Sequence, residues 1–266
     1  MDKTYQPLAD AEVLEIARAY YEKRAAQTKP QNEPVMVLIG AQPGAGKSRA
    51  ATMMRAELSM RGGYVHVDAD RMRLKINTQG ARPSSQETQM DAGKLAQALR
   101  AQAMIGRRNV LVEGTFRDSR FAAEFIETVK KAGYRMEMVA VATPREESLL
   151  GIYQRYEYQH QTNVDNPRFV EESFHDAAMG GFERNLAENA GRFARVRIVN
   201  RDCQVLFDSA RQPGLSAIEA LKDAQRLDGK RLATIAESWR HVREQAEGRG
   251  ADAPYLQAVR RHEERT

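Results

Sequence analysis

A glycine-rich stretch that directly follows a short apolar run limits the folds open to this chain. Residues 34–40, PVMVLIG, have the pattern of a strand buried on both faces, and residues 41–48, AQPGAGKS, form a loop before an expected helix near Gly46. The loop matches the phosphate-binding pattern G-x-x-x-x-G-K-[ST], except that Ala41 fills the first glycine position and the glycine stands at Gly40. We expect this small residue to be tolerated. The motif therefore predicts a nucleotide-binding protein, without specifying a reaction.

Strand-like and helix-like segments alternate through most of the chain. Alternation of this kind is typical of an α/β fold with βαβ crossovers and a parallel sheet flanked by helices. We expect a leading helix from Asp10 to about Ala26 and a helical tail after Ser216, and we divide the chain into segments 1–33, 34–212 and 213–266. Strands are expected within 63–70, 109–115, 134–143, 194–200 and 204–209, with helices at 92–106 and 119–133.

Composition narrows the class of protein. The formal charge of +5 comes from 41 basic and 36 acidic residues that are interspersed, so the charge pattern does not favour a nucleic-acid partner. One cysteine, Cys203, cannot form an internal disulfide, which fits a reducing compartment. The first residues have no apolar stretch of signal-peptide length, and no run of about 18 apolar residues occurs. We therefore expect a cytoplasmic protein without a membrane partner.

The loop itself predicts contacts with ATP and Mg²⁺. Backbone N–H groups and the following helix N-terminus bind phosphate oxygens, Lys47 reaches the β- and γ-phosphates, and the Ser48 hydroxyl ligates the metal. Glycines at 44 and 46 allow the backbone to approach the phosphates closely. The predicted cofactor-binding residues are Gln42, Pro43, Gly44, Ala45, Gly46, Lys47, Ser48 and Arg49.

Polar side chains follow the next two predicted strands. In VDAD, Asp70 can act on an acceptor hydroxyl as a base, whereas Asp68 can hold Mg²⁺ through water or cap the helix that follows. In VEGTFR, Glu113 and Thr115 can bind sugar or base hydroxyls, and Arg117 can bind phosphate. A salt-bridged Glu113 without a ligand is the structural alternative.

Two arginines complete the predicted site. Arg155 in YQRYE and Arg168 in NPRFV are spaced so that a helix and the segment after it could bring both guanidinium groups over the nucleotide. Such arginines stabilise the charge on a transferred γ-phosphoryl group. The NRD turn at residues 200–202 could close over the adenine, although the sequence gives no firm reason to place it there.

Taken in order, these stretches resemble the zeta toxin family of bacterial toxin–antitoxin systems. The resemblance runs from about residue 34 to about residue 210 and rests on AQPGAGKS, VDAD, VEGTFR, LLGIYQRYE, NPRFVEESFHD and VRIVNRDCQVLFDS. It implies a P-loop kinase fold and ATP-dependent phosphorylation of the sugar 3′-hydroxyl of UDP-N-acetylglucosamine. The resemblance implies that Asp70 is the base and that Lys47 and Ser48 contact phosphate and Mg²⁺. It also implies that Arg155 and Arg168 bind the γ-phosphate. The sugar nucleotide would contact Glu113, Thr115 and Arg117.

One position departs from the family pattern. Where the family places a substrate-contacting glutamate on the helix before the third strand, this chain has Ala96 and Gln97. Gln97 can still donate and accept hydrogen bonds, so we keep it as a substrate-binding residue and expect the acceptor to be a UDP-sugar, with an antitoxin protein as a further partner. The alternatives are a P-loop kinase of another small molecule or of a nucleic-acid 5′-end, and a non-catalytic ATP-binding module.

Overall fold

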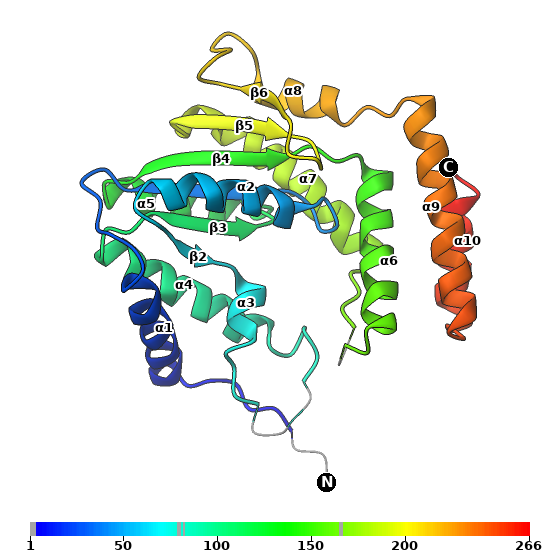
Figure 1. Ribbon diagram of the computed structural model, residues 1–266, viewed down its shortest axis with the longest axis horizontal. Helices are drawn as coiled ribbons and strands as arrows, with labels where there is room; N and C mark the ends of the chain where they lie inside the picture. The colour runs from blue at the N-terminus through cyan, green and yellow to red at the C-terminus, as the bar shows by residue number, and fades with distance from the viewer. Residues whose placement is uncertain (1–3, 79–80, 82, 165–166) are drawn as a thin grey trace.

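Six strands form one sheet at the centre of the molecule (Figure 1). The computed structural model describes residues 4–78, 81, 83–164 and 167–266. The strand order is β2-β3-β1-β4-β5-β6, and every neighbouring pair is parallel except β5 and β6, which are antiparallel. The strands are β1 (Val35–Gly40), β2 (Val65–Val67), β3 (Val110–Gly114), β4 (Arg135–Val141), β5 (Arg195–Val199) and β6 (Val205–Asp208).

Helices cover both faces of the sheet and extend beyond one end of it (Figure 1). They are α1 (Asp10–Ala25), α2 (Lys47–Met60), α3 (Ala69–Arg73), α4 (Gln89–Ile105), α5 (Ser119–Lys131), α6 (Arg145–Gln161), α7 (Glu172–Asn189), a 3₁₀ turn (Ala190–Arg192), α8 (Ala217–Ala224), α9 (Gly229–Gly248) and α10 (Ala253–Glu263). Within the described residues, no helix combines the length and apolar character that crossing a membrane requires.

The central strand β1 buries side chains on both faces. Val37 and Ile39 pack with α2, whereas Met36 and Leu38, which alternate with them, pack into the cluster formed with α1, α4, α5 and α7. Alternate residues of a strand point to opposite faces, so a strand between two helical layers must be apolar throughout. This explains the continuous run PVMVLIG and confirms the predicted α/β sheet flanked by helices.

The last strand departs from the parallel arrangement for a geometric reason. A parallel neighbour needs a crossover connection of a dozen or more residues, whereas the expected turn between β5 and β6 is only a few residues long. Asn200 closes that turn, because its backbone N–H donates to the carbonyl of Gln204 and its carbonyl accepts from the N–H of Cys203. The short connection therefore makes β6 antiparallel.

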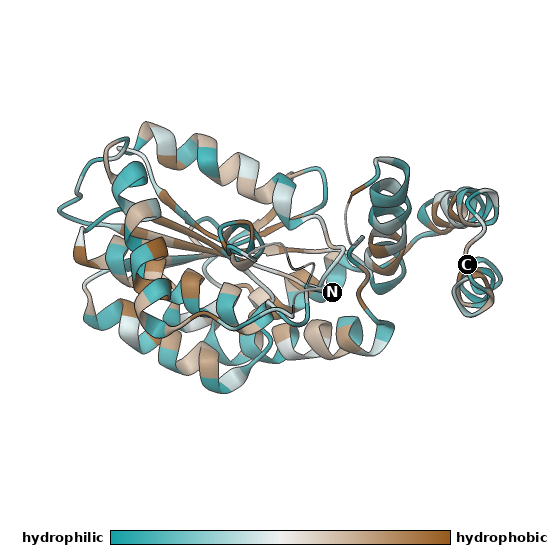
Figure 2. Cartoon of the chain, turned by 90° about the horizontal axis from the view of Figure 1, so that it is seen from below, coloured by the Kyte–Doolittle hydropathy of each residue, from teal (hydrophilic) through white to brown (hydrophobic). Residues whose placement is uncertain are grey.

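The last two helices of the tail form a hairpin that packs on α6, whereas α8 packs on β5 and β6. Helices α9 and α10 pack on each other and α9 packs on α6, around a small core that includes Tyr153, Ile235, Trp239 and Val259. Figure 2 shows the C-terminal end lying beyond the strands, with the brown apolar residues concentrated in the strands themselves. The hairpin thus shares with α6 a hydrophobic core that is separate from those of the sheet, and α6 links it to the sheet.

Candidate active site

The phosphate loop lies between β1 and α2, at the carboxyl edge of the parallel strands. Both Gly44 and Gly46 have positive φ angles, of 76° and 94°, which glycine adopts without strain. A Cβ atom on Gly44 would lie 1.9 Å from the carbonyl oxygen of Ser148, so the loop packs directly on α6. The positive φ and this close approach explain why the loop requires glycine at 44.

We expect Gly44→Ala to destabilise the fold through this contact. Both the positive φ and the overlap with a backbone carbonyl oppose a side chain, and overpacking costs about 1–3 kcal/mol. Gly133→Ala is the matched control, because Gly133 also has a positive φ of 73° but nothing lies within 4 Å of the added atom. Urea unfolding should therefore show a larger loss in the free energy of unfolding for Gly44→Ala than for Gly133→Ala. Equal losses in the two variants would mean that the positive φ alone accounts for the effect.

The ammonium group of Lys47 folds back over the loop. Its Nζ donates to the carbonyl oxygens of Ala41 and Gln42, each at 2.9 Å. Burial, together with nearby Arg155 and Arg168, lowers the pKa of Lys47 to about 8, although the Glu113 and Asp70 carboxylates act in the opposite direction. The interactions place residues from four separate segments around one lysine.

Asp70 and Arg168 meet at the same place although they are 98 positions apart in the chain. Nη1 of Arg168 donates to Oδ2 of Asp70, and Nη1 of Arg73 donates to Oδ1 at 2.5 Å. Burial alone would raise the pKa of Asp70, but the ion pairs with Arg168 and Arg73 outweigh it and hold the pKa below its usual range. Asp70 is therefore a carboxylate at neutral pH, next to an arginine.

Arg155 differs from Arg168 in forming no ion pair with the residues that the structure describes. Its Nε and Nη2 atoms are buried and have no hydrogen-bond partner among the described residues. Burial, together with the neighbouring Arg168, lowers the pKa of Arg155. Buried donors without partners are rare in folded proteins, because each one forgoes its hydrogen bond to water. The Nε and Nη2 donors of the Arg155 guanidinium group are therefore suited to bind an anionic ligand.

The carboxyl end of β2 provides a second cluster, which includes a residue that sequence reasoning missed. His66 Nε2 lies 2.7 Å from Oε1 of Glu113, and its Nδ1 lies 2.6 Å from Nη1 of Arg71. Because a guanidinium group can only donate, Nδ1 of His66 accepts and Nε2 donates to Glu113. The imidazole therefore fixes the Glu113 carboxylate. A signal existed, since His66 and Asp68 lie two residues apart and so face the same side of the strand.

Asp68 takes the helix-capping position that was one of its two predicted roles. Its Oδ1 accepts from the backbone N–H of Asp70, the second residue of α3. Burial and the nearby Glu113 carboxylate raise the pKa of Asp68. The possible metal-ligand atoms of His66, Asp68 and Glu113 all lie within 4.8 Å of one another. Mg²⁺ prefers oxygen ligands, so the two carboxylates suit it better than the imidazole, whose two nitrogens are already engaged.

Other predicted residues lie nearby with fewer contacts. Thr115 is half-buried just after β3, and Arg117 is exposed, with its guanidinium 4.2 Å from the centroid of the Phe174 ring. Ser48 is exposed at the start of α2, and Arg49 pairs with Asp202 at 3.0 Å. Gln97 is exposed on α4, and no hydrogen bond in the described chain joins it to Glu113, Thr115 or Arg117.

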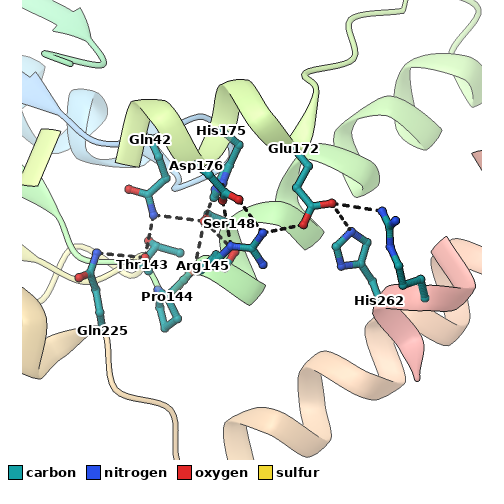
Figure 3. Close-up of polar contacts among 11 residues, drawn as sticks. Gln42, Thr143, Pro144, Arg145, Ser148, Glu172, His175, Asp176, Gln225 and His262 are labelled. Atoms are coloured by element: carbon teal, nitrogen blue, oxygen red, sulfur yellow. Dashed lines mark hydrogen bonds and ion pairs between the residues drawn. The ribbon is translucent and has the colours of Figure 1, made fainter. Parts of the chain in front are cut away.

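The side chain of Gln42 points into the protein. Its amide nitrogen donates to the Thr143 carbonyl at 2.8 Å and to Ser148 Oγ at 3.1 Å (Figure 3). Ser148 in turn lies 2.7 Å from Nε2 of His175, whose Nδ1 lies 2.9 Å from Asp176. Although this is a serine–histidine–aspartate series, Ser148 and His175 are fully buried, so no substrate reaches the hydroxyl. The series holds the Gln42 side chain of the phosphate loop in place and performs no hydrolysis.

A pocket opens beside the phosphate loop. It has a volume of about 340 Å³ and is lined from the loop and α2, from α6, from the NRD turn and from α9. Its lining residues are Gly46, Ser48, Arg49, Glu147, Leu150, Gln154, Arg201, Asp202, Thr234, Ile235 and Ser238. The NRD turn therefore lies next to the start of α2, and its place over an adenine stays a prediction.

Comparison with known proteins agrees with this arrangement. The Zeta toxin family model matches residues 18–212, which is most of the chain. The chain belongs to the zeta toxin family. Toxin PezT of Streptococcus pneumoniae serotype 4 (strain ATCC BAA-334 / TIGR4) is 28% identical over 203 residues, covering 73% of this chain and 79% of that protein. Toxin zeta of Enterococcus hirae is 23% identical over 219 residues, covering 79% and 76%.

Solved structures share the fold of this zeta toxin family member. A structure from the PezAT chromosomal toxin–antitoxin system of Streptococcus pneumoniae aligns with a TM-score of 0.76 and 22% identity, covering 97% of this chain and 100% of that one. The AvrRxo1-ORF1:-ORF2 structure with ATP aligns with a TM-score of 0.59 and 15% identity, covering 96% and 83%. The predicted resemblance to the family is confirmed, and the fold is kinase-like.

Proposed function

We propose that this zeta toxin is an ATP-dependent kinase that phosphorylates the sugar 3′-hydroxyl of UDP-N-acetylglucosamine or a related UDP-sugar. The observation that carries the proposal is the gathering of Lys47, Arg155 and Arg168 around the Asp70 carboxylate, next to a phosphate loop. Three cations suit a triphosphate, and an ionised carboxylate in contact with one of them suits a group that takes a proton from a hydroxyl.

In this reaction each residue has one task. Asp70 accepts the proton of the acceptor hydroxyl, whose oxygen then forms a bond to the γ-phosphorus while the bond to the β,γ-bridging oxygen breaks and ADP leaves. Arg155 and Arg168 neutralise the charge on the transferred group, and Lys47 neutralises charge at the β- and γ-phosphates. The contact between Arg168 and Asp70 supports this assignment, because base and phosphate must lie on either side of the same attacking oxygen.

The remaining parts of ATP and of the acceptor have places nearby. We assign the nucleoside of ATP to the pocket of about 340 Å³ beside the loop, which the NRD turn helps to line. Ser48, with Asp68 through water, would hold Mg²⁺, which when bound supplies positive charge to the phosphates. Glu113, fixed by His66, and the neighbouring Thr115 and Arg117 would bind the UDP-sugar.

The family also supports a toxic role and a protein partner. The PezAT neighbour comes from a chromosomal toxin–antitoxin system, and we infer that this chain likewise acts as a bacterial toxin that an antitoxin protein inhibits. Depletion of a cell-wall precursor would explain the toxicity. Because ATP and nucleotide sugars are cytoplasmic metabolites, we infer that the reaction takes place in the cytoplasm.

An acceptor screen tests the proposal. We expect ADP release only when an acceptor is present, and mass spectrometry should show phosphorylated UDP-N-acetylglucosamine. Because Gln97 replaces a glutamate of the family pattern, UDP-N-acetylgalactosamine should be used within about tenfold, corresponding to about 1.4 kcal/mol. Phosphate transfer to some other hydroxyl compound while every UDP-sugar stays unmodified would reject the acceptor, and ATP binding without any transfer would indicate a non-catalytic module.

A further inference from the structure

Helix α6 has two different faces, and only one of them borders the phosphate loop. A Cβ atom on Gly151 would lie 2.6 Å from the carbonyl oxygen of Gly44, and Gly44 in turn packs on Ser148. Arg155 follows Gly151 by four positions, so both lie on the same side of the helix. The loop-facing side of α6 therefore carries the guanidinium group whose Nε and Nη2 have no hydrogen-bond partner in the described part of the chain.

The opposite face of α6 is covered by the C-terminal hairpin, α9–α10. The ring of Tyr153 lies 5.0 Å from that of Trp239 and 5.3 Å from that of Tyr255, measured between centroids. Figure 1 shows α9 and α10 running beside α6, on the side away from the sheet. Helix α6 therefore has the phosphate loop on one face and the hairpin on the other. The hairpin packs against the helix that carries Arg155.

One side chain of the hairpin contacts the neighbours of both arginines. Tyr255 of α10 lies 5.4 Å from the ring of Tyr156, which follows Arg155, and 5.7 Å from the ring of Phe169, which follows Arg168. The segment containing Arg168 and Phe169 is neither helix nor strand. A segment without regular structure needs side-chain contacts to fix its position, and the Phe169 ring, which also packs on Tyr153 and Tyr156, provides them.

An ion pair joins the end of α9 to the same helix. Nε and Nη2 of Arg249 donate to the Glu157 carboxylate at 2.8 and 3.0 Å, and Glu157 is only 1% exposed. The guanidinium of Arg249 also lies over the rings of Tyr156 and Tyr255, at 5.4 and 5.1 Å from their centroids. Because the ion pair has two hydrogen bonds and its carboxylate is buried, it restricts both the distance between the ends of α9 and α6 and their relative orientation.

We propose that the hairpin α9–α10 is a positioning element of the active site, acting through Arg249 and Tyr255 on Arg155 and Arg168. The proposal rests on the proposed phosphotransferase function and extends it to a part of the chain outside the residues that the family model matches. Neither Arg249 nor Tyr255 touches the reacting atoms. Their contribution is to hold two guanidinium groups where charge develops on the γ-phosphoryl group.

Two substitutions test this through different contacts. Arg249→Gln removes the ion pair with Glu157, and Tyr255→Leu removes the aromatic contacts but leaves that ion pair in place. Each should lower kcat at least about tenfold, because small displacements of catalytic groups are costly. The KM for ATP should change less than about threefold, since the phosphate loop still binds the triphosphate. Tyr255→Phe keeps the aromatic ring, so its kcat should stay near that of the wild type.

A matched control separates positioning from general stability. Arg260→Gln breaks the contact with Glu247 at 2.9 Å, which joins α10 to α9 without touching α6, and should leave kcat unchanged. Trp239 is the single tryptophan of the chain and lies in the core between the hairpin and α6, so its fluorescence emission reports whether the hairpin stays docked. If Arg260→Gln lowers kcat as much as Tyr255→Leu does, the effect is general destabilisation and the proposal is wrong.

A double mutant asks whether the hairpin acts through Arg155. Adding Arg249→Gln to Arg155→Ala should lower kcat by less than about twofold more, because coupled residues are not additive. Full additivity, or wild-type kcat in both Arg249→Gln and Tyr255→Leu, overturns the proposal. These results differ from failure of the proposed function, in which the wild-type chain transfers no phosphate or Arg155→Ala leaves transfer unchanged.

Discussion

Lys47→Ala is expected to abolish phosphoryl transfer and, with it, any growth inhibition on expression. Lys47 is the only ammonium group of the loop, and the other cations that gather there, Arg155 and Arg168, are assigned to the γ-phosphoryl group. Removing one preorganised group that stabilises developing charge costs about 10²- to 10³-fold in turnover. Purified protein is assayed for ADP release with the UDP-sugar acceptor, and expression from an inducible promoter gives the growth phenotype.

The pKa of Lys47 provides a second readout for the same residue. Because burial lowers this pKa to about 8, the side chain is charged at pH 7 and loses its proton as the pH rises through about 8. ATP affinity of the wild-type chain should therefore fall between about pH 7 and pH 9, and this fall should be absent in Lys47→Met. Lys94→Ala is a suitable control, because Lys94 pairs with Asp10 on the surface. Toxicity that survives in Lys47→Ala would exclude a kinase mechanism.

The phosphate loop and the sheet could be predicted from sequence because their signals are local. The apolar run before Gly40 and the glycines at 44 and 46 report constraints within about fifteen residues, namely burial on both faces and a positive φ. Asp70 and Arg168 are each predicted at the nucleotide from their own surroundings, and the resemblance supports both roles, but no spacing rule predicts contact between two residues 98 positions apart. The structure brings them into contact.

Contacts that depend on tertiary packing could not be read from the sequence. Gln42 was predicted among cofactor-binding residues from its place in the loop, but the direction of its side chain depends on Thr143 and Ser148, about a hundred residues away. The hairpin is a similar case, because a polar helical tail gives no sign that Tyr255 will lie beside Phe169. Such contacts follow from the three-dimensional arrangement of α6, not from local patterns.

Asp70→Asn is the other substitution with a large expected effect. An amide cannot accept the proton of the acceptor hydroxyl, so we expect turnover to fall by about 10²-fold or more while the affinity for ATP stays near that of the wild type. The ion pairs that depress the pKa of Asp70 keep it ionised as the pH falls from 8 to 5, so the wild-type rate should not decline from protonation of Asp70 in that range. Titration with a fluorescent ATP analogue and single-turnover transfer measure affinity and turnover separately.

The competing explanation is that Asp70 only holds Arg168 in place, and two further variants decide between them. Arg73→Gln removes the other ion pair of Asp70 but leaves its carboxylate and the contact with Arg168, so turnover should fall far less than in Asp70→Asn. In an Arg168→Ala background the structural contact is already lost. A base must still act there, so Asp70→Asn should lower turnover by about a further tenfold or more, whereas a residue whose only partner is Arg168 would have no additional effect. An unchanged rate in that double mutant would leave the transfer reaction without its assigned base.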